Sequence, residues 1–172
     1  MKKYIFVSVS TIAVAIWIAF ILSNSSKTGV ESGSMSKAVC EAINNFFDNI
    51  NLNITVSERF VRKSAHFCEY MILSSLICAD ILSLSAFFEK MKEKRIFFWL
   101  PLAVPLSALV AFFDEFGVQR STAGRGPSLR DVIIDTGGAA FGVLALICLL
   151  LLCFSIRKKS ACAKTKNNNP PA

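Results

Sequence analysis

Four long apolar runs, separated by short charged segments, constrain the fold of this chain more than any other feature. They extend over residues 4–22, 66–88, 96–113 and 132–156. A helix that crosses the hydrocarbon core of a bilayer needs about 20 mostly apolar residues, and each run comes close to that length. Hydrophobic residues make up 53% of the chain and the mean hydropathy is +0.53, which exceeds what one soluble core needs. We therefore expect an all-α integral membrane bundle of four transmembrane helices.

The distribution of lysine and arginine predicts the orientation of this bundle, because positively charged short loops stay in the cytoplasm. These residues gather at Lys2 and Lys3, in the segment 89–95 and in the segment 157–166. The sequence thus predicts a plasma-membrane protein with both termini in the cytoplasm. Residues 23–65 and 114–130, which connect the other ends of the apolar runs, are then expected to face outward. Arg120, Arg125 and Arg130 in the second of these segments weaken the charge bias.

The first outward segment has the pattern of a helix that lies along a membrane. Its apolar residues recur at helical spacing opposite polar ones. The apolar positions are Met35, Val39, Ile43, Phe46, Phe47 and Ile50, and the polar ones are Lys37, Glu41, Asn45 and Asp48. This pattern predicts an amphipathic helix that lies on the outer membrane surface or packs over the mouth of the bundle. Thr55 and Glu58 then indicate a capping box at the start of the next helix.

The rest of the composition narrows the class of protein. Residues 1–159 are expected to form one membrane domain, and residues 160–172, which are polar and end in Pro170-Pro171-Ala172, a disordered cytoplasmic tail. The net charge of +7 does not indicate nucleic-acid binding, because the basic residues flank apolar runs, where they contact anionic lipid. We expect membrane lipid as a partner and no nucleic acid. The six cysteines form no CxxC pair and predict no disulfide framework.

Several residues inside the apolar runs predict local features. Pro101 and Pro105 each remove a backbone hydrogen bond and favour a bend in the third helix. Gly138 and Gly142 are four residues apart, which favours close packing against another membrane helix. Asp80 lies within the second run toward its cytoplasmic end, and we expect it to form a pair or to lie in a wet cavity.

Three charged clusters lie where apolar runs begin or end, over residues 62–70, 114–119 and 125–135. Ionisable groups at membrane depth are costly and usually mark a functional site or a tightly paired network. Positions three and four apart share a helix face, so Arg62, His66 and Glu69 are expected to point the same way. All three clusters lie on the predicted outer side.

The same spacing rule predicts which side chains of the other two clusters face the bundle. Asp114 and Glu115 are adjacent, so we expect only one to face inward, and Glu115 is favoured because Gln119 shares its face. Asp131 and Asp135 are four residues apart in the first turns of a helix that is expected to begin near residue 128, where acidic residues complement the helix dipole.

In their order and position these motifs resemble those of the VanZ-like membrane proteins. The motifs are Asn24-Ser25-Ser26-Lys27, Arg62-Lys63-x-x-His66-x-x-Glu69-Tyr70, Asp114-Glu115-x-x-x-Gln119 and Arg125-x-x-Ser128-x-x-Asp131-Val132-x-x-Asp135-x-x-Gly138. Lys27 and Asp135 depart from the pattern, which often has Gln and Asn at these places. The resemblance implies an association with resistance to the glycopeptide teicoplanin, and it supplies no mechanism.

Three interpretations of the charged clusters stay open at the level of sequence. In the first they bind a carboxylate or phosphate of the cell envelope, such as a cell-wall precursor, a glycopeptide-related ligand or a lipid head group, at outward-facing helix N-termini. The neighbouring acids then either recognise an amine or cancel the positive charge. The predicted ligand-binding residues are Arg62, Lys63, His66, Glu69, Glu115, Gln119, Arg125, Asp131 and Asp135.

The other two interpretations need no such ligand. His66 and Glu69, together with Glu115 and Asp131, are residue types that bind metal ions, but no dense metal signature is present and we expect neither a metal nor another cofactor. Alternatively, the arginines and lysines only neutralise the acids, in a network that holds the helices together.

The leading functional hypothesis is an envelope protein whose extracytoplasmic polar site acts on or binds an envelope ligand and lowers susceptibility to teicoplanin-type glycopeptides. The alternative is a membrane hydrolase or transferase acting on a cell-wall or lipid head group, with Glu69 or Glu115 as general base and His66 as acid or base. A third hypothesis is a structural or transport protein without catalysis. The sequence leaves open whether the protein is an enzyme.

Overall fold

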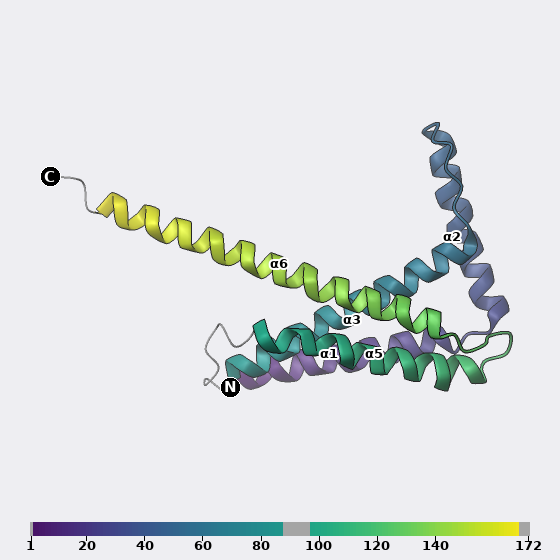
Figure 1. The fold of residues 1–172 in the computed structure, drawn as a ribbon, viewed down its shortest axis with the longest axis horizontal. Coiled ribbons are helices and arrows are strands. Elements are labelled where there is room, and N and C mark those ends of the chain that lie inside the picture. The colour runs from purple at the N-terminus through teal and green to yellow at the C-terminus, as the bar shows by residue number, and fades with distance from the viewer. Residues whose placement is uncertain (1, 88–96, 169–172) are drawn as a thin grey trace.

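The structure is a computed structural model that describes residues 2–87 and 97–168, with side chains described over residues 5–85 and 97–156. In this part of the chain there are five α-helices and no strands (Figure 1). The helices are α1 (Lys2–Ser25), α2 (Gly29–Asn49), α3 (Glu58–Phe87), α5 (Ala103–Phe113) and α6 (Leu129–Asn168). Short turns extend α5 at both ends, namely η1 (Leu100–Leu102), η2 (Asp114–Val118) and η3 (Gln119–Ser121).

Four helical segments are long and apolar enough to cross a membrane, which confirms the predicted fold class. They are Ile5–Ser25, Glu58–Ser85, Phe97–Ser121 and Leu129–Ile156. The predicted ends of the second and third runs at residues 88 and 96 lie outside the described residues. Helices suit this environment because they satisfy their backbone hydrogen bonds internally, where lipid offers no partners.

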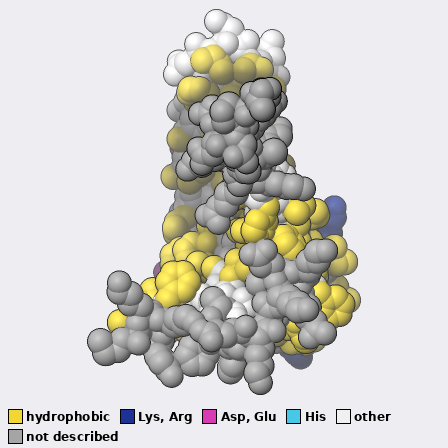
Figure 2. All heavy atoms as spheres, turned by 90° about the vertical axis from the view of Figure 1, so that its left-hand side faces the viewer, with side chains coloured by type: hydrophobic (Ala, Val, Ile, Leu, Met, Phe, Trp, Pro, Cys, Tyr) yellow, Lys and Arg dark blue, Asp and Glu magenta, His cyan; other side chains and the backbone are white. Residues whose placement is uncertain are grey.

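The helix α3 lies at the centre of the bundle, against α1 and α6, and α5 packs against α6 (Figure 1). A small core of buried side chains lies between these helices, including Ile21, Tyr70, Leu73 and Leu100. Many large apolar side chains instead point outward, and Figure 2 shows hydrophobic side chains over the described surface seen from one end of the bundle. Exposed apolar side chains of this kind suit helices whose surroundings are lipid tails.

Two glycines of α6 let this helix approach the backbone of α3. A Cβ atom on Gly138 would overlap the carbonyl oxygen of Phe67, and one on Gly142 would overlap that of Met71. The predicted close-packing role of these glycines is confirmed. It brings the first turns of α6, with their acidic residues, directly beside the start of the membrane-spanning part of α3.

The predicted amphipathic helix is confirmed as α2, which begins at Gly29, six residues before Met35, the first apolar position of the predicted pattern. Thr28 caps it: the Thr28 hydroxyl accepts a hydrogen bond from the backbone N–H of Glu31 at 3.3 Å, and the Glu31 carboxylate accepts one from the Thr28 N–H at 2.9 Å. In Figure 1, α2 runs steeply away from the direction of the bundle, at the end where α1 finishes. We call this end, with Ser25, Arg125 and Leu129, the polar end.

The predicted capping box of Thr55 and Glu58 is wrong, because the residue that caps α3 is Ser57. The Ser57 hydroxyl accepts a hydrogen bond from the N–H of Phe60 at 3.3 Å. Asn44 of α2 binds the backbone of Val56, the residue before this cap: its side chain accepts from the Val56 N–H at 2.8 Å and donates to the Val56 carbonyl at 3.1 Å. The helix begins two residues after this tertiary contact, at Glu58.

The structure also places the two prolines of the third span and Asp80 of the second span. Pro101 lies in the 3₁₀ turn η1 and Pro105 in the first turn of α5, and the predicted bend at these prolines stays a prediction. First-turn positions tolerate proline because their N–H groups lack helical partners. Asp80 of α3 is paired as expected, since Ser10 and Thr11 of α1 donate hydrogen bonds to its carboxylate at 2.6 and 2.9 Å.

The last helix continues past the predicted end of the membrane domain. Its backbone is helical through Asn168, which differs from the disordered tail expected from residue 160. Good helix formers in this stretch, such as Ala161, Ala163 and the lysines, favour continuation of the helix. The division of the chain at residue 159 stays a prediction.

Candidate functional site

At the polar end, the third span changes from an α-helix into a π-helical turn over Asp114–Val118. Such a turn inserts an extra residue and links positions five apart, and it often occurs at functional sites. Asp114 and Glu115 are both buried, with exposed fractions of 0% and 1%. The prediction that only Glu115 faces the bundle is therefore wrong, because it assumed the ordinary helical period throughout this segment.

Asp114 connects three segments that are far apart in the sequence. Its carboxylate accepts hydrogen bonds from the Ser25 hydroxyl at the end of α1 at 2.8 Å and from the Gln119 side-chain amide at 3.0 Å. Sequence reasoning missed both Asp114 and Ser25 as site residues. Ser25 belongs to the serine-rich motif after the first span, and that motif was the signal available for it.

The guanidinium of Arg125 completes this network. Its Nη1 donates to the carbonyl oxygen of Ser25 at 3.1 Å and to Oε1 of Gln119 at 3.2 Å. The loop that carries Arg125 is fixed by Gly124, which has a φ of +76°, and by Gly29, whose N–H donates to the Ala123 carbonyl at 3.0 Å. A Cβ on Gly29 would come within 2.6 Å of the Gly124 carbonyl oxygen, so a glycine is required there.

Arg125 lies outside the spans, and its charge is influenced by its surroundings. Burial lowers the pKa of the Arg125 guanidinium from its ordinary value, and the nearby Arg62 lowers it further, whereas Asp114 raises it. Arginine starts from so high a pKa that it stays protonated under these influences. The site therefore contains a partly buried, permanent positive charge.

Glu115 positions the start of α6. Its Oε1 accepts a hydrogen bond from the backbone N–H of Ser128 at 2.8 Å, and the Ser128 hydroxyl accepts from the N–H of Asp131 at 3.3 Å. Asp131 in turn forms an ion pair with Lys63 of α3. These contacts bind the π-turn, the loop and the first turn of α6 to one another.

The helix α3 contributes His66 and Glu69. The His66 Nδ1 atom lies 3.6 Å from Oε2 of Glu69, one helical turn away. The other oxygen of Glu69 accepts a hydrogen bond from Asn24 of α1 at 2.9 Å, and Asn24 accepts one from Lys27 at the same distance. The predicted shared face of His66 and Glu69 is confirmed.

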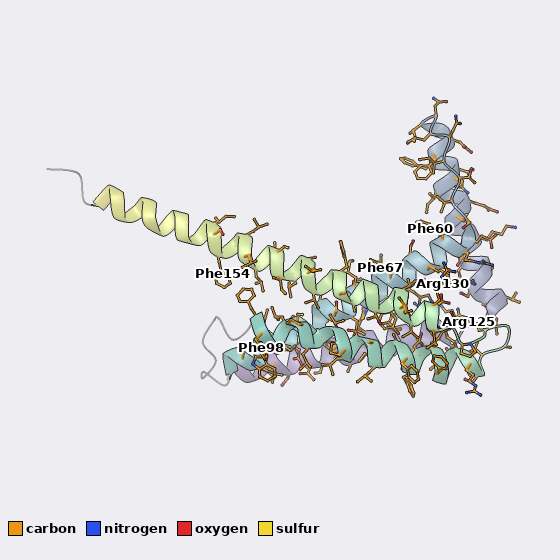
Figure 3. The ribbon with its side chains drawn as sticks, viewed as in Figure 1. Phe60, Phe67, Phe98, Arg125, Arg130 and Phe154 are labelled. Carbon is orange, nitrogen blue, oxygen red and sulfur yellow. The ribbon has the colours of Figure 1, made fainter. Side chains whose placement is uncertain are left out.

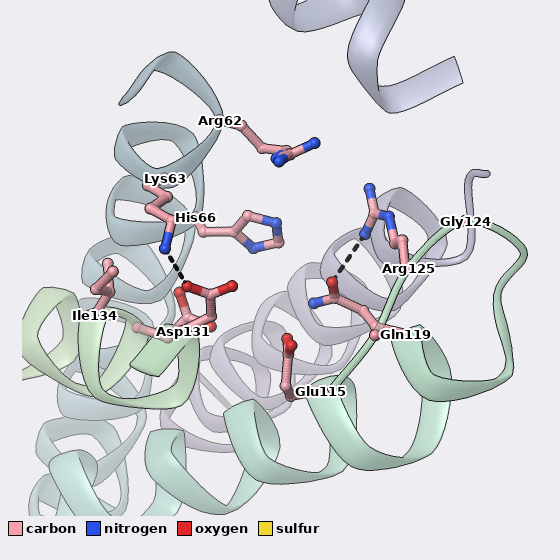
Figure 4. Close-up of a pocket in the computed structure, with 11 residues that line it drawn as sticks. Arg62, Lys63, His66, Glu115, Gln119, Gly124, Arg125, Asp131 and Ile134 are labelled. Atoms are coloured by element: carbon pink, nitrogen blue, oxygen red, sulfur yellow. Dashed lines mark hydrogen bonds and ion pairs between the residues drawn. The ribbon is translucent and has the colours of Figure 1, made fainter. Parts of the chain in front are cut away.

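The three charged clusters meet around one pocket of about 180 Å³ at the polar end (Figure 4). The side chains that line it are Arg62, Lys63, His66, Glu115, Gln119, Arg125, Asp131, Ile134 and Asp135, together with Gly124 and Gly126. All the predicted ligand-binding residues except Glu69 therefore line this pocket. Figure 3 shows Arg125 and Arg130 at this end of the bundle and Phe98 at the opposite end.

Glu69 lies in a second, more apolar pocket of about 210 Å³ between the end of α1, α2 and α3. Met35 and Val39 of α2 and Val61 of α3 form its apolar wall. Arg62, His66 and Arg125 line both pockets, so the two cavities adjoin along these three side chains.

Several buried polar atoms of the site have no hydrogen-bond partner among the described residues. They include Oδ1 of Asp114, Oε2 of Glu115 and Oδ1 of Asp135, whose side chain is 2% exposed. A buried carboxylate oxygen without a donor is costly. Such atoms point to a ligand, a proton or water at the bottom of the pocket.

The candidate metal ligands do not form one cluster in the described part of the chain. No group of three or more His, Cys, Asp or Glu side chains in the described part of the chain is arranged to hold a metal ion. His66, Glu69, Glu115 and Asp131, which the sequence brought forward as metal-ligand types, do not converge on one point.

A comparison with protein families identifies the chain. The family model described as VanZ/LLP1 matches residues 10–154, a range that includes every side chain of the two pockets. No curated protein and no solved structure matches the chain. The match extends over most of the 172 residues, and the chain belongs to the VanZ/LLP1 family.

Proposed function

We propose that this VanZ/LLP1 family membrane protein binds the anionic group of a cell-envelope ligand in the polar-end pocket and thereby lowers susceptibility to teicoplanin-type glycopeptides. The proposal places the pocket on the outer face of the plasma membrane, with both termini in the cytoplasm. Its support is the charge distribution: 11 of the 19 lysines and arginines lie at the chain ends and in residues 89–95, and eight lie in the two segments, residues 23–65 and 114–130, that are proposed to face outward.

The observation that carries the proposal is the state of Arg125. Its guanidinium contacts two neutral oxygens, and none of the ion pairs among the described side chains includes Arg125 or Arg62. Guanidinium groups bind carboxylates and phosphates through paired hydrogen bonds. Two arginines without carboxylate partners beside a pocket therefore favour an anionic ligand.

The start of α6 adds to this preference. Helix N-termini attract anions through the helix dipole, and this part of the preference remains although the N–H groups of Ser128 and Asp131 already donate to Glu115 and to the Ser128 hydroxyl. Asp131 in the first turn of α6 is paired with Lys63 of α3, so this acid does not cancel the positive charge of the arginines. Carboxylates and phosphates at the outer surface belong to membrane lipids and cell-wall precursors, which are the ligands we propose.

Binding at this position explains a protective effect in physical terms. A lipid-anchored glycopeptide acts at the outer membrane surface, and a protein that holds an envelope ligand there reduces what the antibiotic can reach. The site needs no turnover for this effect, which depends only on occupancy.

The test is teicoplanin susceptibility of a sensitive Gram-positive host that expresses the wild type or the double variant His66→Ala, Glu69→Ala. We expect the wild type to raise the inhibitory concentration and the double variant and Arg125→Gln to lose that protection. Lys37→Ala is the matched control, because Lys37 is an exposed cation on α2 that lines neither pocket. Membrane levels are equalised by immunoblot, and equal protection by all variants would reject the proposal.

An enzymatic function is the second candidate, and the pair of His66 and Glu69 favours it. Their separation of 3.6 Å places the His66 imidazole, which lines both pockets, beside a carboxylate of the second pocket, which suits general acid–base chemistry. In this case His66 acts as acid or base and Glu69 or Glu115 as general base. Purified protein would then convert a labelled lipid-linked precursor, and His66→Ala would abolish the conversion; binding without any product would exclude this function.

A further inference from the structure

We propose that the ligand is a zwitterionic amphiphile of the phosphoethanolamine type, with its primary ammonium held by Glu115 and Asp135 and its phosphate by Arg62 and Arg125. This inference rests on the proposed function and names the class of ligand for the same site. Three features of the polar end carry it: a carboxylate floor, an arginine rim and an adjoining apolar cavity.

The floor of the pocket presents carboxylate oxygens that need donors. Glu115 and Asp135 line the pocket, are 1% and 2% exposed, and each has a buried oxygen without a partner among the described residues. In Figure 4, Glu115 points from the third span into the space between the helices. An ammonium group has three N–H donors and a positive charge, which match two such acceptors.

Two cations that line the pocket, Lys63 and Arg125, make other contacts in the described part of the chain. Lys63 bonds to Asp131, and Arg125 donates to Ser25 and Gln119. Among the described residues no cluster is arranged for a metal ion either. An external organic ammonium is therefore the cation that satisfies the floor without displacing an existing contact.

The rim of the pocket has the opposite charge. Figure 4 shows Arg62 and His66 on one side of the cavity and Arg125 on the other, with Glu115 below them in this view. Neither arginine belongs to an ion pair of the described side chains. A ligand with separated charges binds here in one orientation, with its cation inward and its anion at the rim.

The adjoining cavity identifies the ligand as an amphiphile rather than a soluble zwitterion. It meets the charged pocket at Arg62, His66 and Arg125, and its far wall is formed by Met35 and Val39. These residues belong to α2, whose Val30 and Phe46 are also exposed, as expected for a helix at a membrane surface. An acyl chain that leaves the phosphate finds an apolar path toward the bilayer.

The experiment measures lipid binding to the full-length protein in detergent by native mass spectrometry and by the shift in Tm. The probes are phosphatidylethanolamine, phosphatidylcholine and phosphatidylglycerol with identical acyl chains, and free phosphoethanolamine. We expect phosphatidylethanolamine to bind about tenfold more tightly than the other two lipids, since a quaternary ammonium has no N–H donor and glycerol has no charge. Free phosphoethanolamine binds more weakly than the lipid, because it leaves the apolar cavity empty.

Variants separate the two charged parts of the site. The double variant Glu115→Gln, Asp135→Asn removes the preference for phosphatidylethanolamine and leaves phosphatidylglycerol binding unchanged. Arg62→Gln weakens the binding of both lipids. Glu41→Gln is the control, because Glu41 is an exposed acid of α2 outside both pockets. The ranking of lipids by the wild type tests the inference even if the double variant does not fold.

Each contrary outcome has one meaning. Equal binding of the three lipids, or absence of binding, overturns the ammonium site. Equal affinity for free phosphoethanolamine and its lipid overturns the amphiphile. If phosphatidylethanolamine and phosphatidylglycerol bind equally and Arg125→Gln weakens both, this inference fails while the anion-binding function stands. Loss of both lipid binding and antibiotic protection rejects both proposals.

Discussion

Asp114 is fully buried and accepts hydrogen bonds from Ser25 and Gln119, which lie 89 residues before it and 5 residues after it. Gln119 in turn accepts a hydrogen bond from Arg125. At the scale of single residues, the pocket is thus held by side chains behind it as well as by those that line it. Removal of an acceptor behind the pocket, such as Asp114, leaves buried donors without partners and lowers the free energy of unfolding.

Substituting Asp114 by alanine tests this support. The Ser25 hydroxyl and the Gln119 amide lose their acceptor inside the bundle, and we expect the free energy of unfolding to fall by about 2 kcal/mol. Thermal unfolding in detergent, followed by tryptophan fluorescence, provides the measurement. Asp48→Ala is the matched control, because Asp48 is an exposed acid at the end of α2. A Tm for Asp114→Ala equal to that of the control would show that these bonds contribute nothing.

At the scale of elements, two contacts decide where the polar clusters lie. The glycines of α6 set its distance from α3, and the capped start of α2 holds the loop that carries Arg125. Both contacts depend on backbone groups that approach closely. Changes in either place are therefore expected to move a helix rather than a single side chain.

The packing of α6 on α3 is tested by comparing neighbouring glycines. Gly138→Ala adds a methyl group that overlaps the Phe67 carbonyl, whereas the nearest atom to a Cβ on Gly137 is 3.9 Å away. We expect Gly138→Ala to destabilise the protein by about 1–3 kcal/mol and Gly137→Ala to have little effect. Thermal unfolding of both variants checks this, and equal Tm values would contradict the packing model.

The start of α2 is expected to respond to acid. A hydrogen bond from the Thr28 backbone N–H lowers the pKa of Glu31 below 4.5. Because the folded pKa is depressed, this contribution to stability is present above pH 4.5 and is lost as the pH falls through the folded value. Hydrogen exchange at residues 29–36 should therefore increase in acid in the wild type and vary less with pH in Glu31→Gln. An identical pH profile in both proteins would exclude Glu31 as the cause.

At the scale of the whole molecule, the charged side chains of the pocket gather at one end of the bundle, with α2 across that end (Figure 1). The opposite end contains the pair of Asp80 with Ser10 and Thr11. Because the two ends differ in this way, the orientation of the bundle in the membrane decides which ligands the pocket can meet. A pocket that faces outward meets envelope ligands, and one that faces inward does not.

Labelling of single cysteines on intact cells tests the orientation. A membrane-impermeant thiol reagent should label Asp48→Cys, at the exposed end of α2, before lysis and Ala172→Cys only after lysis. The wild type gives the background from the native cysteines. The reverse pattern would place the pocket in the cytoplasm and exclude the proposed function.

The four spans, the amphipathic helix and the gathering of charge near the ends of the spans were all predictable from the order of the residues. Membrane length and helical periodicity are local properties, so Arg62, His66 and Glu69 were predictable as one face. Only the tertiary structure decided that both Asp114 and Glu115 are buried, that Ser57 caps α3, and that the clusters enclose two adjoining pockets. These features depend on a π-turn and on contacts between distant segments, such as Asn44 with Val56, which no local pattern records.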